Sequence, residues 1–190
     1  MGNVNNYSIG KATLYFSEGA AQASPSAARM DDPISFGNIE VAEITPDISY
    51  VEHYVSLKGC RKKDKDLVET KKVTIPFTFD EISASNVKYF MHGGTTIAST
   101  FSVMSKNSIE GRAILQFNTD VGNEFLYVIP KVILKAEGGL SLQADSWING
   151  QFTLEVLNHP RYRVYDSSTA SLAPYGYFSY DTPDVIGSPF

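Results

Sequence analysis

The residues best suited to covalent chemistry in this sequence are one cysteine and three histidines. A catalytic Cys60 would need a neighbouring base, and the available imidazoles are His53, His92 and His159, none of which lies in a recognisable nucleophile motif. A single cysteine also cannot form an internal disulfide. We therefore interpret Cys60 as a loop cysteine.

Carboxylate pairs are a second source of chemistry, because two nearby acids can act as general acid and base. The candidates are Asp31 with Asp32 and Asp80 with Glu81, but adjacent residues on an extended strand point to opposite faces. Asp80 and Glu81 are better explained as favourable charges ahead of a helix N-terminus. No cysteine, histidine or glycine spacing matches a metal site or a phosphate-binding loop. The sequence therefore predicts a protein that is not an enzyme and that uses no cofactor and no metal.

The one dense charge cluster runs from Arg61 to Asp66 and mixes lysines and arginine with two aspartates. A nucleic-acid patch is one interpretation of such a run. Its mixed charge, and the net charge of −5 over 190 residues, argue against a protein that grips phosphates. We interpret the run as a solvated hairpin tip or as a salt-bridging contact with another protein. Trp147 is interpreted as a core or interface residue.

The elements that must position these residues are mostly β-strands. Alternation of apolar and polar residues is clearest over residues 73–79, where Val73, Ile75, Phe77 and Phe79 share one face. The other segments that we expect to be strands are residues 12–16, 39–44, 48–57, 112–117, 125–129, 132–134, 140–142 and 151–157. The predicted fold class is mainly β, with sandwich or barrel-like sheets and one short α-helix.

Two prolines interrupt predicted strands. Pro76 has no N–H to donate to a β-ladder, so its strand is expected to lie at a sheet edge or to carry a bulge there. Pro130 lies between two apolar segments, and we expect a bulge or a break at that point.

The single predicted helix lies within residues 80–94 and is about ten residues long. Ser83 can cap its start, and Gly93 can end it. Val87, Phe90 and Met91 fall on one face, so this face is expected to lean on the sheet.

The length favours one domain of residues 1–165, with a loop insertion at residues 18–33, followed by a C-terminal arm of residues 166–190. The arm is rich in serine, proline and glycine, and its aromatic residues suggest that it packs on a neighbouring subunit. The interface candidates in the arm are Tyr175, Tyr177, Phe178 and Tyr180.

The N-terminus lacks the basic start and apolar run of a signal peptide, and no stretch of about 18 apolar residues suits a membrane span. We therefore expect a soluble protein that is made in a cytoplasm and has no membrane partner.

Several motifs follow one another in a set order: Phe36-Gly37-Asn38 before a long strand, Gly59-Cys60-Arg61-Lys62-Lys63-Asp64 in a loop, Asp80-Glu81-Ile82-Ser83-Ala84-Ser85-Asn86 before a short helix, Ile129-Pro130-Lys131-Val132, and Asp145-Ser146-Trp147. This order resembles that of the tail tube proteins of long-tailed bacteriophages, the siphophages. The likeness extends over residues 10–157 and rests on the order and spacing of these motifs together.

This resemblance implies subunits that join as hexameric rings and stack into a hollow tube, which conducts the phage genome during ejection. The sheets of a ring would together form one inner β-barrel. DNA would pass through the lumen without specific binding, and the other partners would be the tape measure, tail terminator and distal tail proteins. The implied location is the virion tail, after synthesis in the cytoplasm of the host bacterium.

The resemblance also implies roles for particular residues. A long stacking loop at residues 57–68 would join successive rings, through Gly59, Cys60, Arg61, Lys62, Lys63, Asp64, Lys65 and Asp66. An acidic lumen would repel DNA, and its candidate residues are Glu40, Glu43, Asp47 and Glu52.

Two other functions remain open on the sequence. One is a monomeric ligand-binding β-sandwich or barrel, with Trp147 and the tyrosines as its platform. The other is a relative of the tube protein, such as a tail terminator, an adaptor or the tube of a contractile tail.

Overall fold

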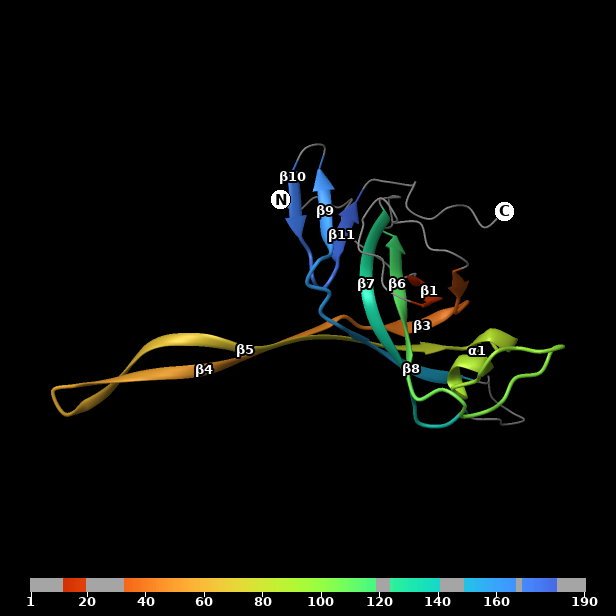
Figure 1. Cartoon of the computed structure of the whole chain (residues 1–190), viewed down its shortest axis with the longest axis horizontal. Coiled ribbons are helices and arrows are strands. Elements are labelled where there is room, and N and C mark those ends of the chain that lie inside the picture. Colours follow the sequence, from red (N-terminus) through yellow and green to blue (C-terminus); the bar gives the residue numbers. More distant parts are fainter. Residues whose placement is uncertain (1–11, 20–32, 119–123, 141–148, 167–168, 181–190) are drawn as a thin grey trace.

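Antiparallel β-strands make up most of the chain. The computed structural model describes residues 12–19, 33–118, 124–140, 149–166 and 169–180 (Figure 1). The elements within these residues are β1 (Ala12–Glu18), β2 (Ile34–Ser35), β3 (Ile39–Ala42), β4 (Thr45–Leu57), β5 (Cys60–Phe79), α1 (Ala84–Phe90), β6 (Ile109–Asn118), β7 (Glu124–Glu137), β8 (Gly150–Val156), β9 (Arg163–Asp166), β10 (Thr169–Leu172) and β11 (Tyr177–Tyr180). The prediction of a mainly β fold with one short helix is confirmed for this part of the chain.

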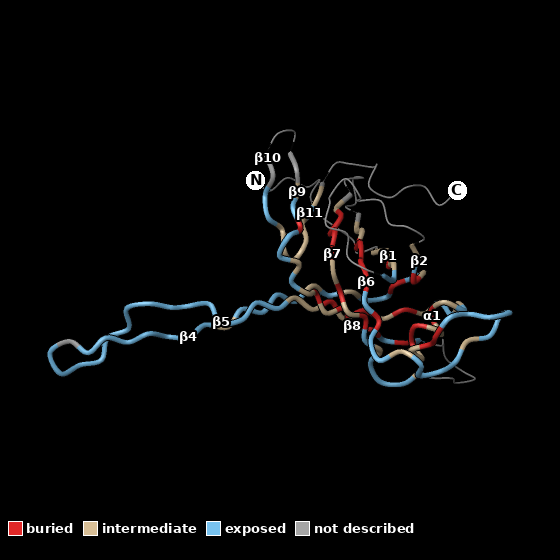
Figure 2. The backbone as a smooth tube through the Cα atoms, in the orientation of Figure 1, coloured by how far each residue is buried: buried red, intermediate tan, exposed pale blue. Residues whose placement is uncertain are grey.

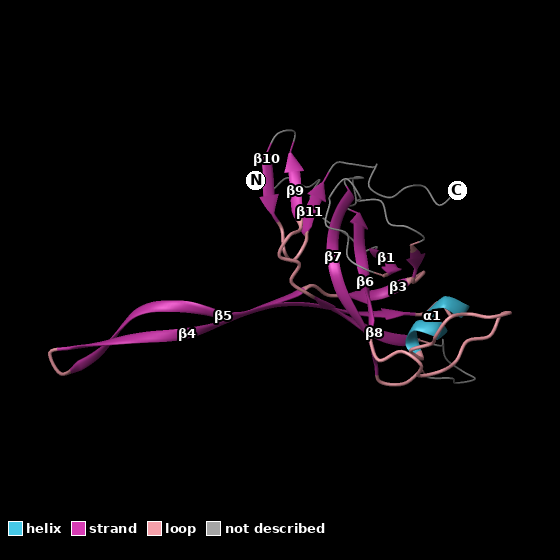
Figure 3. Ribbon diagram, in the orientation of Figure 1, coloured by secondary structure: helices cyan, strands magenta, loops and turns pink. Residues whose placement is uncertain are grey.

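Nine of these strands form one sheet in the order β2-β1-β6-β7-β8-β5-β3, with β11 beside β7 and β4 beside β5. All of its paired neighbours are antiparallel. Strands β9 and β10 form a separate pair. Although β1 and β3 lie towards opposite ends of this order, they contact each other, so the sheet curls around its apolar face (Figure 3).

The core inside this curl is built from aromatic rings. Phe152 on β8 lies directly opposite Phe77 on β5, and its ring also contacts Phe36, Phe79 and Phe90 at centroid separations of 5.1 to 5.6 Å. Alternation places Phe77, Phe79 and Phe152 on one face of their strands. Phe36 comes from the turn after β2 and Phe90 from α1, and burial of each ring contributes roughly 1.5–3 kcal/mol. The apolar face predicted for residues 73–79 is therefore part of the core.

Pro76 lies in a central strand whose register with β8 is regular at that position, so the prediction of an edge strand or a bulge there was wrong. Its strand β5 pairs with β8 on one side and with β3 and β4 on the other. The carbonyl of Pro76 accepts a hydrogen bond from Glu43 N at 3.1 Å. Because the nitrogen and carbonyl of a strand residue point the same way, the proline nitrogen faces the gap between β3 and β4. The ladder is already interrupted there, which explains why a proline is tolerated.

Pro130 marks a bulge, as the sequence indicated, and not a break. Strand β7 runs through it, while the register with β6 shifts between Gly111 and Ala113. The bulge also divides the other edge of β7: residues 125–128 pair with β11, and residues 132–137 pair with β8.

The predicted helix is present as α1, and Ser83 is its N-cap. The Ser83 hydroxyl accepts a hydrogen bond from Asn86 N at 3.1 Å. Phe90 is buried as expected, and Val87 and Met91 are half-buried. The chain leaves the helix at Met91, two residues before Gly93.

Asn86 explains why two of the sequence motifs belong together. Its side-chain amide is fully buried and donates to the carbonyls of Phe36 and Glu81, at 3.0 and 2.8 Å. Asn38 donates to the Asp80 carboxylate at 2.7 Å. The turn at residues 36–38 and the start of α1 are therefore fastened to each other, and both motifs act as parts of the framework.

The described C-terminal strands, within residues 163–166 and 169–180, pair inside their own subunit, which corrects the prediction of a separate arm for this part of the chain. The predicted boundary after residue 165 falls inside β9, which pairs with β10. Strand β11 then adds to β7, with Tyr177 opposite Val128 and Tyr180 opposite Phe125. The hydroxyl of Tyr127 donates to the carbonyl of Tyr175 at 2.8 Å. Strand β8 pairs with β7 only after Pro130, so the backbone groups of residues 125–128 on the same edge are available to β11.

The side chains of the arm candidates differ in exposure. Tyr175 and Tyr177 are half-buried against their own sheet, whereas Phe178 is 52% exposed and stacks on Tyr127 at 4.4 Å. The insertion at residues 18–33, the strand at residues 140–142, Trp147 and residues 181–190 lie wholly or mostly outside the described residues.

Candidate functional site

The most unusual feature of the molecule is a two-stranded ribbon that projects from the sheet (Figure 1). Strands β4 and β5 pair continuously from Thr45 opposite Thr74 to Leu57 opposite Cys60. Only the C-terminal part of β5, residues 73–79, also pairs with β8. We call residues 47–72 the ribbon. Within the described chain, the outer edge of β4 has no partner strand, and neither has the outer edge of β5 over residues 60–72.

A two-residue turn closes the ribbon. Lys58 and Gly59 both have positive φ angles, of 50° and 78°, as a type I′ hairpin turn requires. The predicted stacking loop at residues 57–68 is therefore a strand from Cys60 onward, with only its first residues in a turn. The alternating charges of residues 61–66 concealed this strand, because no apolar face accompanied them.

Both faces of the ribbon are exposed (Figure 2). Val51 and Leu67 lie directly opposite each other, and each is 48% exposed. On the other face, Ile48, Tyr50 and Val68 are 45 to 56% exposed. Sequence reasoning assigned none of these five residues to a site, although the β-branched and aromatic content of residues 48–57 was a usable signal.

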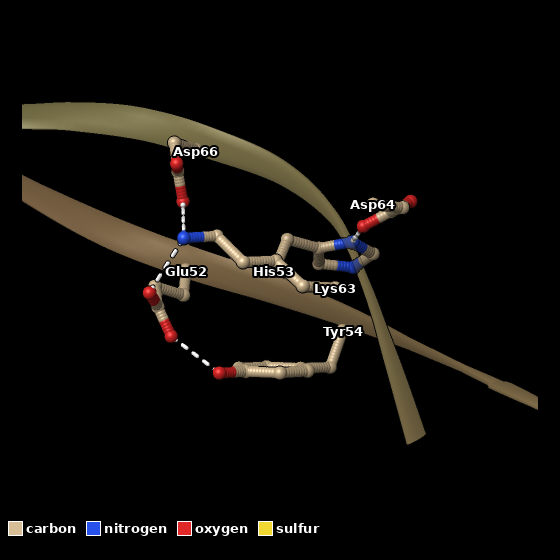
Figure 4. Close-up of polar contacts among 6 residues, drawn as sticks. All are labelled: Glu52, His53, Tyr54, Lys63, Asp64 and Asp66. Atoms are coloured by element: carbon tan, nitrogen blue, oxygen red, sulfur yellow. Dashed lines mark hydrogen bonds and ion pairs between the residues drawn. The ribbon is translucent and has the colours of Figure 1, made fainter. Parts of the chain in front are cut away.

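A set of polar contacts crosses the ribbon (Figure 4). Lys63 Nζ lies 2.6 Å from Glu52 Oε1 and 2.8 Å from Asp66 Oδ1, and the Tyr54 hydroxyl donates to the other Glu52 oxygen. The hydrogen bonds from Lys63 and Tyr54 lower the pKa of Glu52. The bonds to Asp66 and Glu52 raise the pKa of Lys63. Solvent screens such exposed pairs, so these contacts fix the cross-strand geometry and add little stability.

Two bulges twist the ribbon. The register shifts between Ser49 and Tyr50 and again between His53 and Tyr54. At the second shift, the unpaired residue Asp64 contacts His53, with 2.6 Å between Nδ1 and Oδ1 (Figure 4). Bulges increase local twist and make an edge selective about what can pair with it. The bulges thus give the ribbon a defined twist, although most of its residues are exposed to solvent.

The four acidic residues predicted for a lumen do not share one face. Asp47 and Glu52 are five residues apart on β4, whose pairing skips no β4 residue, so they point to opposite faces. Glu52 is paired with Lys63. Glu40 lies at a register shift in β3, and Glu43 lies in the gap between β3 and β4. Glu40, Glu43 and Asp47 are each exposed and follow one another along β5, from the end of the sheet beside Phe79 to the base of the ribbon beside Lys72.

Glu155 joins the base of the ribbon to the sheet. It lies on β8, contacts Lys135 on β7, and is 3.8 Å from Lys72 on β5. The hydrogen bond from Lys135 is the main cause of a lowered pKa for Glu155. Charged contacts among β5, β8 and β7 therefore connect the base of the ribbon to the sheet.

The remaining candidate residues do not come together. Cys60 is exposed at the first position of β5, while His92 follows α1 and His159 lies near Tyr162. Among the described residues, no group of three or more His, Cys, Asp or Glu side chains could hold a metal ion. No helix in the same residues is long and apolar enough to cross a membrane.

Neither a scan against models of protein families nor a search of curated proteins finds a match to this chain.

Proposed function

We propose that this protein is a structural subunit that polymerises through its ribbon. The observation that carries the proposal is a two-stranded ribbon with apolar side chains exposed on both faces and backbone groups unpaired along both edges. A two-stranded hairpin is marginally stable by itself in water. Surfaces of this kind are typical of protein interfaces. Neighbouring subunits would bury these apolar side chains and pair with the free strand edges.

The edges of the ribbon favour a ring. Strand β4 presents one free edge, and β5 presents a different one, so copies that join edge to edge use two unlike surfaces. Such heterologous contacts close into rings when the rotation between copies allows it. A closed ring would leave no free strand edge.

We propose further that these rings are hexamers that stack into the tail tube of a siphophage. The resemblance of the motifs supports this assignment, and residues 57–68, for which the resemblance implies a stacking role, lie within the exposed ribbon. The acidic net charge of −5 suits a conduit that DNA must pass without adhering. The tape measure, tail terminator and distal tail proteins would be its partners in the virion tail.

The test is to remove the ribbon and keep the sheet. Asp47 and Lys72 lie directly opposite each other, so Asn-Gly in place of residues 48–71 would join them with a two-residue hairpin turn. We expect wild-type protein at high concentration to form hollow tubes of uniform width in negative-stain electron microscopy. The shortened variant should remain a monomer.

A matched control separates lost assembly from lost folding. The shortened variant should retain a cooperative unfolding transition and the near-ultraviolet circular dichroism of the aromatic core, because the core lies outside the ribbon. Tubes formed by the shortened variant would sink the proposal. Single rings of wild-type protein that never stack would favour a tail terminator or adaptor. A persistent wild-type monomer that binds a small ligand would favour the ligand-binding module.

A further inference from the structure

Two groups of exposed charges lie at opposite ends of the ribbon. The cationic tip consists of Lys58, Arg61, Lys62 and Lys65, and the acidic base consists of Glu40, Glu43 and Asp47. Within the described residues, no member of either group forms an ion pair. Between them, Lys63 contacts Glu52 and Asp66, and Asp64 contacts His53.

The two groups cannot neutralise each other within one subunit. A strand rises about 3.3 Å per residue, so Asp47 and Leu57 at the two ends of β4 are roughly 33 Å apart. Charges interact in physiological salt over about 8 Å. Lys71 lies opposite Ile48 and thus points to the other face from Asp47. Lys72 lies directly opposite Asp47 and is also 3.8 Å from Glu155, so the base keeps more acidic than basic groups. Attraction between tip and base therefore requires a second copy of the chain.

We infer that the cationic tip of one subunit docks on the acidic base of a second subunit. Overlap of the two ribbons over this length covers the exposed pair Val51 and Leu67 along the way. The contact rests on the proposed function, because in a stack of rings it joins subunits of successive rings. Tip-to-tip and base-to-base contacts place like charges together, which disfavours them. The contact thus gives the stack a single direction.

The test uses three full-length variants with the same number of reversed charges. The tip variant carries Lys58→Glu, Lys62→Glu and Lys65→Glu, which leaves Arg61 over the Tyr54 ring. The base variant carries Glu40→Lys, Glu43→Lys and Asp47→Lys. The control variant carries Lys88→Glu, Arg161→Glu and Arg163→Glu, all of them outside the ribbon. Circular dichroism and thermal unfolding establish that each variant folds.

The tip variant has an acidic tip and an acidic base, and the base variant has two basic surfaces. Each variant alone should need roughly a hundredfold higher concentration to associate than the wild type, because like charges now meet. An equimolar mixture of the two variants should associate again, with the two chains alternating. The control variant alone should associate like the wild type, because its tip and base are unchanged. The association of wild type should also weaken as salt rises.

Light scattering and sedimentation velocity measure association, and electron microscopy shows its form. Unchanged association of the tip and base variants alone, or a mixture that remains monomeric, would overturn the tip-to-base contact while the tube proposal stands. A mixture that forms only two-chain particles, with a wild type that does the same, would keep the contact and overturn the tube. A wild type that remains monomeric at low salt would overturn both.

Discussion

Strand β5 runs through both the ribbon and the body of the sheet, yet its side chains are exposed in the ribbon and largely covered in the body. Along β5, residues 74–79 alternate between half-buried and buried positions, whereas all the residues from Cys60 to Lys72 are exposed. The body pairs its strands and fills its interior with Phe36, Phe77 and Phe152. Among the described strands, the residues of the ribbon pair only with each other.

This difference separates the free energy of folding from that of assembly. Buried aromatic side chains stabilise the body without a partner. The ribbon gains little by folding alone, since its apolar groups remain in water and its ion pairs are screened. Changes in the body should therefore alter monomer stability, and changes in the ribbon should alter association.

The largest effect on the body is expected at alkaline pH. Burial raises the pKa of Tyr89, Tyr127 and Tyr162 to about 12 in each case. Their folded pKa exceeds the ordinary value near 10, so their contribution to stability is complete below about pH 10 and is lost as the pH rises through about 12. At about 1–2 kcal/mol for each phenol, the loss approaches the stability of a typical domain.

Denaturant unfolding followed by circular dichroism from about pH 9 to about pH 12 measures this loss. Tyr127→Phe removes one buried phenol and should flatten part of the pH dependence. A free energy of unfolding that stays constant across this range would contradict the raised pKa of these buried tyrosines.

Truncation of the central core ring tests the body directly. Phe152→Ala removes contacts with Phe36, Phe77, Phe79 and Phe90 and should lower the free energy of unfolding by about 3–5 kcal/mol. The matched change in the ribbon is Tyr50→Ala, whose side chain is 56% exposed. Equal losses in the two variants, measured by denaturant unfolding, would erase the distinction between body and ribbon.

The return of β11 to the body depends on one glycine. Gly176 has a φ of 95°, and an added Cβ would lie 2.2 Å from the Val128 carbonyl oxygen. Gly176→Ala should cost about 1–3 kcal/mol and should speed hydrogen exchange on the β11-facing edge of β7. The control is Gly139→Ala, because among the described residues nothing beyond its chain neighbours would lie within 4 Å of an added Cβ. Unchanged exchange in the Gly176 variant would show that β11 is not held in this way.

The smallest effect on monomer stability is expected in the ribbon. The paired change Val51→Ser with Leu67→Ser should alter the free energy of unfolding by less than about 1 kcal/mol, since both residues are half in water. The same variant should lose association in light scattering, because its apolar contact surface is gone. If this variant associated as well as the wild type but were much less stable, the ribbon would contribute to folding and not to assembly.

Local patterns identified much of the body. Alternation located the strands around Phe77 and Phe152, and Ser83 identified the start of the helix. The ribbon was only partly predicted: residues 48–57 were recognised as a strand, but residues 60–72 were not. Their charges gave no apolar face, and their partner strand supplies the pairing that local sequence does not encode.

The sequence by itself determined which residues are apolar on one face, and therefore a mainly β fold with an aromatic core. Only the tertiary structure decided which strands pair, that β4 and β5 leave the sheet as a ribbon, and that β11 returns to β7. Alternation assigns a side chain to a face of its strand. It does not choose the neighbouring strand, because backbone hydrogen bonds can form with any edge that has matching register.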